Sequence, residues 1–210
     1  MLNTTFFDSL SEDVKKEIRL WSKTALEVPE ENLNNLPMCP FAKKAWDSGR
    51  VKIHVQNLEK YRLDLLDTIL EKFDDSYDVE IIVDLCFCED TQTFHDCIDQ
   101  YNNSLWRKDI WLMGYHPYDE VDTEDVDFEA VVDQSYSMIF VQRLSKLQEA
   151  SDKLSMQGYY KNLKEFISNP LFRKRKRLYR RMINAGYEKR YEKKRNKEEE
   201  SGNAWRWHGS

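Results

Sequence analysis

The sequence predicts an α/β domain in which helices cover a small sheet of three or four strands, at least partly parallel. A basic helical extension is expected to follow this domain. Short apolar segments of strand length alternate with longer segments whose apolar residues recur every three or four positions. The chain has 210 residues and is 40% hydrophobic, which is enough for one sizeable core. Lysine and arginine are concentrated after residue 170, which separates a body from a tail.

Residues 5–26 are expected to form an amphipathic helix. Its apolar residues are spaced mostly by three or four: Phe6, Phe7, Leu10, Val14, Ile18, Trp21 and Leu26. A loop rich in Pro, Asn and Glu then covers residues 28–40. Proline is typical of the first turn of a helix, so a short helix is expected over residues 40–46 with Cys39 at its N-cap.

Three strands are predicted in the middle of the chain. Residues 51–55 alternate apolar and polar side chains, residues 79–85 form a nearly continuous apolar run, and residues 109–115 are a third candidate. Amphipathic helices are expected between them, over residues 58–73 and 91–106. Strands separated by helices of this length favour right-handed crossovers, so we expect at least partly parallel pairing.

The remainder of the domain is predicted to be a loop and two helices. Residues 116–134 form an acidic loop, residues 136–154 a helix and residues 158–167 a shorter helix. The acidic α/β domain is therefore expected to span residues 1–168. Residues 169–210 are expected to form a basic helical tail with a frayed end.

The formal net charge of −6 hides a strong asymmetry. Residues 1–170 carry 18 Lys and Arg against 33 Asp and Glu, a net charge of −15. Residues 171–210 carry 14 Lys and Arg against 5 Asp and Glu, a net charge of +9. The average thus combines an acidic body with a basic end.

The sequence favours a cytoplasmic protein with no membrane partner. The first 26 residues carry charges throughout and lack the apolar core of a signal peptide. No run approaches the roughly 18 apolar residues that a membrane span needs. Four cysteines in such a chain are expected to be reduced thiols.

Three segments resemble the signatures of one known family. Residues 35–44 (Asn-Leu-Pro-Met-Cys-Pro-Phe-Ala-Lys-Lys) resemble a Leu-Cys-Pro-Phe-Ala signature. Residues 114–118 (Gly-Tyr-His-Pro-Tyr) resemble an aromatic-His-Pro signature at the end of a strand. Residues 136–143 (Tyr-Ser-Met-Ile-Phe-Val-Gln-Arg) resemble a Tyr-Pro-Met-Leu-His-Leu-Leu-Arg signature that opens a helix.

Together these segments are similar to the uncharacterised bacterial family called domain of unknown function fourteen-fifteen, over roughly residues 15–154. The chain departs from the family pattern at two positions: Ser137 stands where the family carries Pro, and Phe140 where it carries His. The resemblance implies a fold and the location of a site, but no reaction and no cofactor.

Cys39 is the first candidate for a catalytic residue, as a reactive thiol. At a helix N-cap its thiol would face unpaired backbone N–H groups and the positive end of the helix dipole, which stabilise a thiolate. Lys43 and Lys44, one turn along, would act in the same direction. The alternative is a small apolar cap packed beneath Phe41. Ala42 stands where a Cys-Pro-x-Cys redox motif would carry its second cysteine.

His116 and Arg143 are the next candidates. His116 follows the third predicted strand, where ligand sites open in α/β sheets, and Pro117 restricts its backbone. It could act as a general base, a metal ligand or a hydrogen-bond donor, or simply hold loop carbonyls. Arg143 could bind a carboxylate or phosphate in a bidentate fork, or pair with an acidic side chain such as Asp84.

One hypothesis is therefore an enzyme whose catalytic residues are Cys39, His116, Tyr136 and Arg143. They would line one pocket and carry out a thiol-assisted reaction on a small anionic ligand. All four fall within the segments that resemble the family and near the ends of predicted elements. The hypothesis requires that these side chains meet across one cavity.

Two segments carry residue types that can bind metal ions. Cys86 and Cys88, with His95 and Cys97, offer ligand types that suit zinc, but an extended Cys-x-Cys points its side chains to opposite faces. The acidic run over residues 119–133 lacks the regularly spaced ligands and central glycine of a calcium loop. Buried thiols and a solvated charge run are the favoured readings, and no metal is predicted.

The second hypothesis is a binding protein that acts through its tail. Residues 171–195 carry 12 basic and 2 acidic residues with interleaved tyrosines. Such a stripe can neutralise phosphates and stack on unpaired bases, or it can dock on an acidic protein surface, including its own body. Mere solubility is the third reading. The candidate residues are Arg173, Lys174, Arg175, Lys176, Arg177, Tyr179, Arg180 and Arg181.

Overall fold

The computed structural model describes residues 4–56, 64–85, 90–119, 136–161 and 169–200, and the side chains of most of them. The α-helices are α1 (Thr4–Trp21), α2 (Ala42–Asp47), α3 (Asp64–Lys72), α4 (Thr91–Leu105), α5 (Leu144–Met156) and α7 (Pro170–Glu200). Shorter helical turns are η1 (Ser22–Leu26), η2 (Glu31–Leu33) and η3 (Trp106–Lys108). The strands are β1 (Pro29–Glu30), β2 (Leu36–Pro37), β3 (Val51–Gln56), β4 (Val79–Asp84), β5 (Ile110–Tyr115) and β6 (Ser137–Arg143).

Four strands form the central sheet in the order β3-β4-β6-β5. β3 and β4 pair in parallel, and β6 pairs antiparallel with both β4 and β5. One end of the sheet is consequently formed by the last residues of β3, β4 and β5 and the first residues of β6. At this end Asp84 lies opposite both Gln56 and Ser137. This mixed sheet confirms the predicted fold class.

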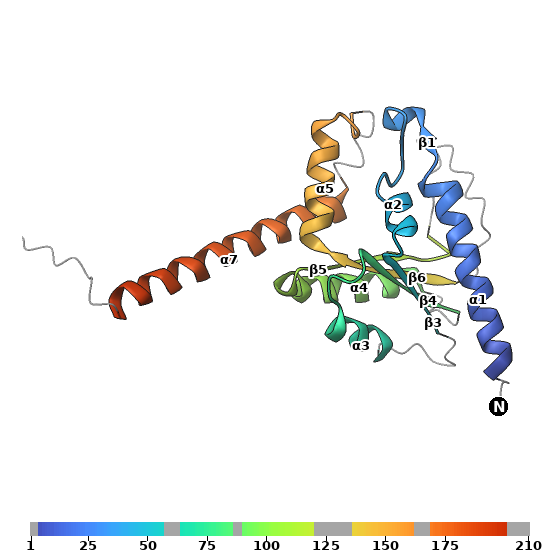
Figure 1. The fold of residues 1–210 in the computed structure, drawn as a ribbon, viewed down its shortest axis with the longest axis horizontal. Coiled ribbons are helices and arrows are strands. Elements are labelled where there is room, and N and C mark those ends of the chain that lie inside the picture. The colour runs from blue at the N-terminus through green and yellow to red at the C-terminus, as the bar shows by residue number, and fades with distance from the viewer. Residues whose placement is uncertain (1–3, 57–63, 86–89, 120–135, 162–168, 201–210) are drawn as a thin grey trace, which may run out of the picture.

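Helices cover the two faces of the sheet, and Figure 1 shows α3 and α4 on the side opposite α1. On one face Leu66 of α3 and Phe94 of α4 pack against Ile82, Leu112 and Ile139 of the sheet. On the other face Val14 and Ile18 of α1 pack against residues from the alternate positions of the same strands. The period of two along each strand separates the two cores.

Gly114 lets α4 lie close to β5. A Cβ atom at this position would come within 2.3 Å of Ile98 Cδ1 and 2.7 Å of Phe94 Cε1. The missing side chain leaves the space that the two core residues of α4 occupy. A larger residue at this position would force the Ile98 and Phe94 side chains to move.

The predicted helix over residues 136–154 is wrong in its first half. Residues 137–143 form β6, a central strand, and α5 begins only at Leu144. Met138 and Ile139 face opposite cores, so both faces of β6 are buried, as in a strand at the centre of a sheet. A continuous apolar run of this kind has no period that distinguishes strand from helix.

The predicted short helix begins later than expected. α2 starts at Ala42, with Phe41 at its N-cap position, so Cys39 lies outside the helix. The preceding loop contains the small antiparallel pair of β1 and β2. The other predicted helices and strands agree with the described residues, although the helix predicted over residues 158–167 falls mostly outside them.

α7 leaves the body as a long projecting helix, as Figure 1 shows. Its first half is nevertheless packed against the domain. Leu178 is 2% exposed and lies in a cluster with Trp106, Trp111 and Leu144, and Met182 packs against the same cluster. The body and the beginning of the tail therefore share apolar contacts. No helix among the described residues combines the length and the apolar character needed to cross a bilayer.

Candidate functional site

Arg143 lies at the last position of β6 and acts as a clamp between elements. Its Nε donates to Asp75 Oδ1 at 3.3 Å, its Nη1 to the Lys108 carbonyl at 3.3 Å and its Nη2 to the Phe73 carbonyl at 3.4 Å. The guanidinium also lies 4.9 Å from the centre of the Phe73 ring. Lys146 and Arg143 together hold the pKa of Asp75 below its ordinary value. These contacts connect β6 to the segments that follow α3 and precede β5.

His116 lies at the opposite edge of the sheet, just after β5. Its ring is 1% exposed and packs 5.4 Å from the Phe94 ring. Its Nδ1 accepts from the Tyr118 N–H at 3.2 Å, and its own N–H donates to Asp119 Oδ2 at 2.8 Å. The other oxygen of Asp119 lies 2.6 Å from His95 Nε2. The described contacts of His116 thus shape the start of the loop after β5.

A buried polar row accompanies His116 at this edge. Gln56, Asp84 and Ser137 lie on neighbouring strands, on the face that α3 and α4 cover, and each is at most 8% exposed. The Gln56 side-chain N–H₂ donates to Asp84 Oδ2 at 3.0 Å, while Gln56 Oε1 accepts no hydrogen bond from the described part of the chain. Gln56 and Ser137 are not among the site residues predicted from the sequence. The sequence feature that could have indicated them is a polar residue at the end of an otherwise apolar strand segment: Gln56 and Asp84 end β3 and β4, and Ser137 begins β6.

Cys39 is held in a different part of the molecule. Its N–H donates to the Leu26 carbonyl at 2.9 Å, and Tyr159 donates to the neighbouring Met38 carbonyl at 2.7 Å. Burial raises the pKa of the Cys39 thiol, outweighing hydrogen bonds from the N–H groups of Phe41 and Ala42. The two N–H groups lower the pKa of the thiol as expected, but the net shift is upward, so the thiol is not activated as a nucleophile.

Tyr136 is buried beneath α1. Its ring is 5% exposed, and its hydroxyl donates to Glu17 Oε2 at 3.2 Å. Burial, followed by the Glu17 carboxylate, raises the pKa of this phenol above its ordinary value. The neutral phenol is a link between α1 and the start of β6.

The structure does not bring the four predicted catalytic residues together. Arg143 and His116 lie at opposite ends of the paired strands β5 and β6. Tyr136 hydrogen-bonds to Glu17 of α1, and the Cys39 N–H donates to the Leu26 carbonyl at the end of η1. Within the described ranges, no group of three or more His, Cys, Asp or Glu is placed to hold a metal ion. Cys86 and Cys88 lie outside those ranges.

The predicted tail residues divide into two sets on α7. One set anchors the helix. Arg175 is 8% exposed, donates to Ser151 Oγ at 2.6 Å and to Gln148 Oε1 at 3.2 Å, and lies 4.7 Å from the Phe172 ring. Burial lowers the pKa of its guanidinium. Lys174 pairs with Asp99 at 2.7 Å.

Two further predicted binding residues belong to this anchoring set. Lys176 lies 3.7 Å from Asp152. Tyr179 packs, partly buried, against the cluster around Leu178, and burial followed by Glu149 raises the pKa of its phenol. Tyr179 is therefore part of the contact between α7 and the body, not an exposed surface for stacking bases.

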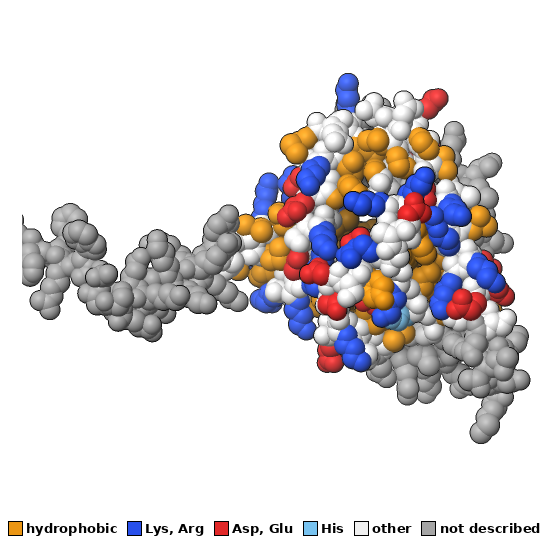
Figure 2. Space-filling model, viewed as in Figure 1, with side chains coloured by type: hydrophobic (Ala, Val, Ile, Leu, Met, Phe, Trp, Pro, Cys, Tyr) orange, Lys and Arg blue, Asp and Glu red, His pale blue; other side chains and the backbone are white. Residues whose placement is uncertain are grey.

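The second set forms the arginine face of α7, which we define as Arg173, Arg177, Arg180 and Arg181. All four side chains are exposed, and none forms an ion pair with a described residue. Together with Phe172, Lys176 and Asn184 they line an open depression of about 510 Å³. Figure 2 shows Lys and Arg side chains around the root of this helix, whereas positive and negative side chains are interspersed over the body.

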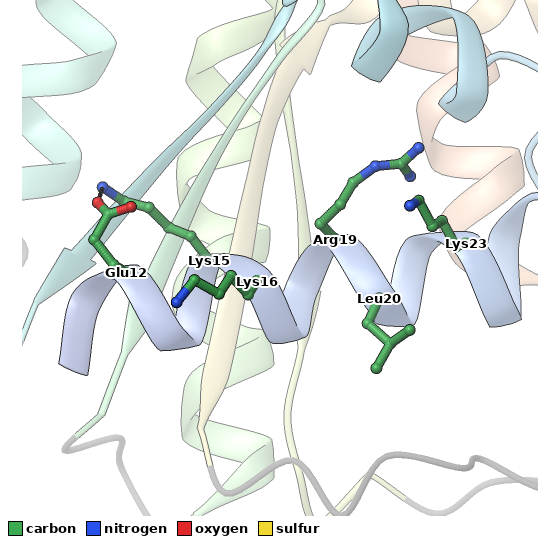
Figure 3. Close-up of a pocket in the computed structure, with 6 residues that line it drawn as sticks. All are labelled: Glu12, Lys15, Lys16, Arg19, Leu20 and Lys23. Carbon is green, nitrogen blue, oxygen red and sulfur yellow. Dashed lines mark hydrogen bonds and ion pairs between the residues drawn. The ribbon is translucent and has the colours of Figure 1, made fainter. Parts of the chain in front are cut away.

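A second basic surface lies on α1, but unlike the arginine face of α7 most of its basic side chains form ion pairs. A depression of about 410 Å³ is lined by Glu12, Lys15, Lys16, Arg19, Leu20 and Lys23, which Figure 3 shows along one side of the helix. Lys15 pairs with Glu12 at 2.7 Å, Lys16 pairs with Asp13 at 2.8 Å, and Arg19 pairs with Glu27. Most of its positive charge is already neutralised within the protein.

Fold and surface define an α/β protein with a four-stranded mixed sheet and a projecting basic helix, whose arginine face forms no ion pair with the residues that the structure describes. Scans of this chain against protein-family models, curated proteins and solved structures find no match. The similarity to domain of unknown function fourteen-fifteen stays a prediction from the sequence signatures.

Proposed function

We propose that this protein binds the phosphate backbone of double-stranded nucleic acid through the arginine face of α7. The observation that carries the proposal is the exposure of Arg173, Arg177, Arg180 and Arg181 without a described carboxylate partner. The body carries a net charge of −15, so carboxylates are abundant nearby. They pair with Lys174 and Lys176 and leave the arginines to solvent.

The spacing of these arginines fits a linear array of anions. Arg173, Arg177 and Arg181 follow one another at four-residue intervals, which is about 6 Å of helix rise. Arginine forms bidentate hydrogen bonds with phosphate and always carries its charge. A straight row of such groups favours a regular polyanion over an irregular acidic protein surface.

The binding is expected to be independent of sequence. Tyr179 packs against the body, and the partly buried Phe172 ring already contacts the Tyr160 ring and the Arg175 guanidinium, so stacking on bases is not expected here. The affinity would then follow phosphate density, which is higher in a duplex than in a single strand. Contacts to phosphates position a protein on nucleic acid without reading the bases.

The test is the salt dependence of binding to a fluorescently labelled random-sequence DNA duplex, measured by anisotropy. Four phosphate contacts, one for each arginine of the face, give a slope of about −3.6 in log K against log salt, so the affinity should fall roughly 150-fold between about 50 and 200 mM salt. Arg177→Gln with Arg180→Gln should make the slope shallower by about 1.8. Glutamine keeps the helix propensity at these exposed positions.

Lys43→Gln with Lys44→Gln is the matched control. It removes the same charge from exposed positions on α2 and should leave the slope unchanged. The proposal is overturned if the unaltered protein does not bind the duplex, or if the arginine variant binds like the control variant. Poly-glutamate serves as a competitor, and binding of poly-glutamate without binding of the duplex would indicate an acidic protein partner instead.

A further inference from the structure

The body contributes an exposed arginine beside α7 that is not among the predicted binding residues. Arg107 belongs to η3, which follows α4, and its guanidinium lies 4.7 Å from the centre of the Trp106 ring. The Arg181 guanidinium of α7 lies 5.3 Å from the same ring. The two cations are therefore within about 10 Å of each other, and both contacts are in the range of a cation–π interaction.

Neither of these guanidiniums is neutralised by a described carboxylate. The chain has no acidic residue from position 100 to 108. Asp109, the next acidic residue, accepts hydrogen bonds from the Ser145 N–H at 2.7 Å and the Ser145 hydroxyl at 2.6 Å. Its carboxylate is thereby committed to the start of α5. An anion that contacted both guanidiniums would be attracted by two uncompensated positive charges at once.

The location of Arg107 continues the arginine face of α7. Lys174 lies two turns from Arg181 on the same side of α7 and pairs with Asp99 of α4, so this side of α7 is turned toward α4 and η3. Leu178 of α7 and Trp106 of η3 belong to one buried cluster, which fixes the two elements against each other. The basic surface thus passes from the tail to the body at this junction.

We infer that Arg107 is a further phosphate-binding residue, and that the nucleic acid lies in the corner between α7 and η3 with a phosphate between Arg107 and Arg181. This inference rests on the proposed function of α7. Arg107 adds a contact from the body, so the nucleic acid would be held by both α7 and η3. Because Trp106 is only 7% exposed, it positions the two guanidiniums and does not stack on a base.

The test is Arg107→Gln in the full chain, with the same labelled duplex. The loss of one phosphate contact should make the salt slope shallower by about 0.9 and weaken binding several-fold at low salt. Arg107→Lys keeps the charge and should retain most of the slope. Lys72→Gln, an exposed position on α3, is the control and should bind like the unaltered protein.

The outcomes separate the two proposals. If the unaltered protein fails to bind the duplex, the proposed function of α7 is lost together with this inference. If it binds, and the Arg177 and Arg180 substitutions weaken binding while Arg107→Gln matches the Lys72 control, only the role of Arg107 is refuted. Urea unfolding of each variant checks the fold, and Arg107→Lys decides the result if the glutamine variant is destabilised.

Discussion

At the scale of single residues, burial and hydrogen bonding act on Cys39 in opposite directions. Burial is the larger influence and raises the pKa of the thiol, and the nearby Glu27 carboxylate adds to the rise. The N–H groups of Phe41 and Ala42 lower the pKa, but by less. α2 has only six residues and begins at Ala42, so no long helix dipole assists them.

We therefore expect Cys39 to react slowly with iodoacetamide. The thiolate is the reactive form, and a raised pKa keeps the thiol protonated at neutral pH. Labelling of the native protein, followed by peptide mass spectrometry across pH, should give a midpoint for Cys39 above that of a free cysteine. The unfolded protein in urea is the control. A midpoint below the free value would restore the activated nucleophile of the enzyme hypothesis.

At the scale of elements, helices and strands with a clear apolar period could be predicted from the sequence, whereas the apolar run that forms β6 could not. α1, β3, β4, α4 and β5 follow from clear periods of 3.6 or 2, or from a short apolar run between helices. β6 was predicted as helix because both its faces are buried. A similar run in β4 was assigned correctly, since charged and turn-forming residues bound it to strand length on both sides.

This one error also displaced the predicted site. A helix over residues 136–143 would keep Tyr136 and Arg143 about 10 Å apart. The extended strand separates them by roughly 23 Å and puts Arg143 at the opposite edge of the sheet from His116. The enzyme hypothesis depended on that geometry. Strand order and register are tertiary properties, and no single segment of the sequence specifies them.

α7 offers a matched pair of arginines two residues apart, Arg175 and Arg173. Arg175→Ala should destabilise the protein, because Gln148 and Ser151 are buried and would lose their hydrogen-bond partner, at a cost of about 1–3 kcal/mol. Arg173→Ala should leave the free energy of unfolding nearly unchanged, because its side chain is exposed and lacks a described ion pair. Urea unfolding measures both.

The same pair tests the division of α7 into an anchoring set and an arginine face. Arg173→Ala should weaken duplex binding, while Arg175→Ala should retain binding under conditions where it remains folded. The division of roles would be contradicted if Arg173→Ala destabilised the protein as much as Arg175→Ala. It would also be contradicted if only the Arg175 substitution changed the salt slope.

At the scale of the whole molecule, tyrosines connect elements that are distant in the chain. Tyr136 bonds to Glu17 of α1, Tyr101 of α4 donates to Asp67 of α3 at 2.9 Å, and Tyr159 bonds to the loop before Cys39. Burial and a neighbouring aspartate raise the pKa of Tyr101 to about 12, and burial raises the pKa of Tyr136 and Tyr159 as well. The folded protein thus keeps these phenols neutral.

The sign of the resulting pH dependence follows from linkage. An unfolded tyrosine ionises near pH 10, whereas these folded ones ionise higher, so between those values the unfolded state loses protons first. Each such tyrosine contributes stability that is fully present below about pH 10 and is lost as the pH rises through the folded pKa. The protein should therefore become less stable with rising pH above about 10.

Tyr136→Phe isolates this effect from the general increase in negative charge. At about pH 8 the variant should be less stable by roughly 0.5–1.5 kcal/mol, because the hydrogen bond to Glu17 is lost. Phenylalanine cannot ionise in the unfolded state, so the difference in urea midpoint between the two proteins should shrink between about pH 10 and 11. Tyr101→Phe should behave in the same way through its bond to Asp67. A difference that stays constant across this range would show that the phenols ionise as readily in the folded protein as in the unfolded chain.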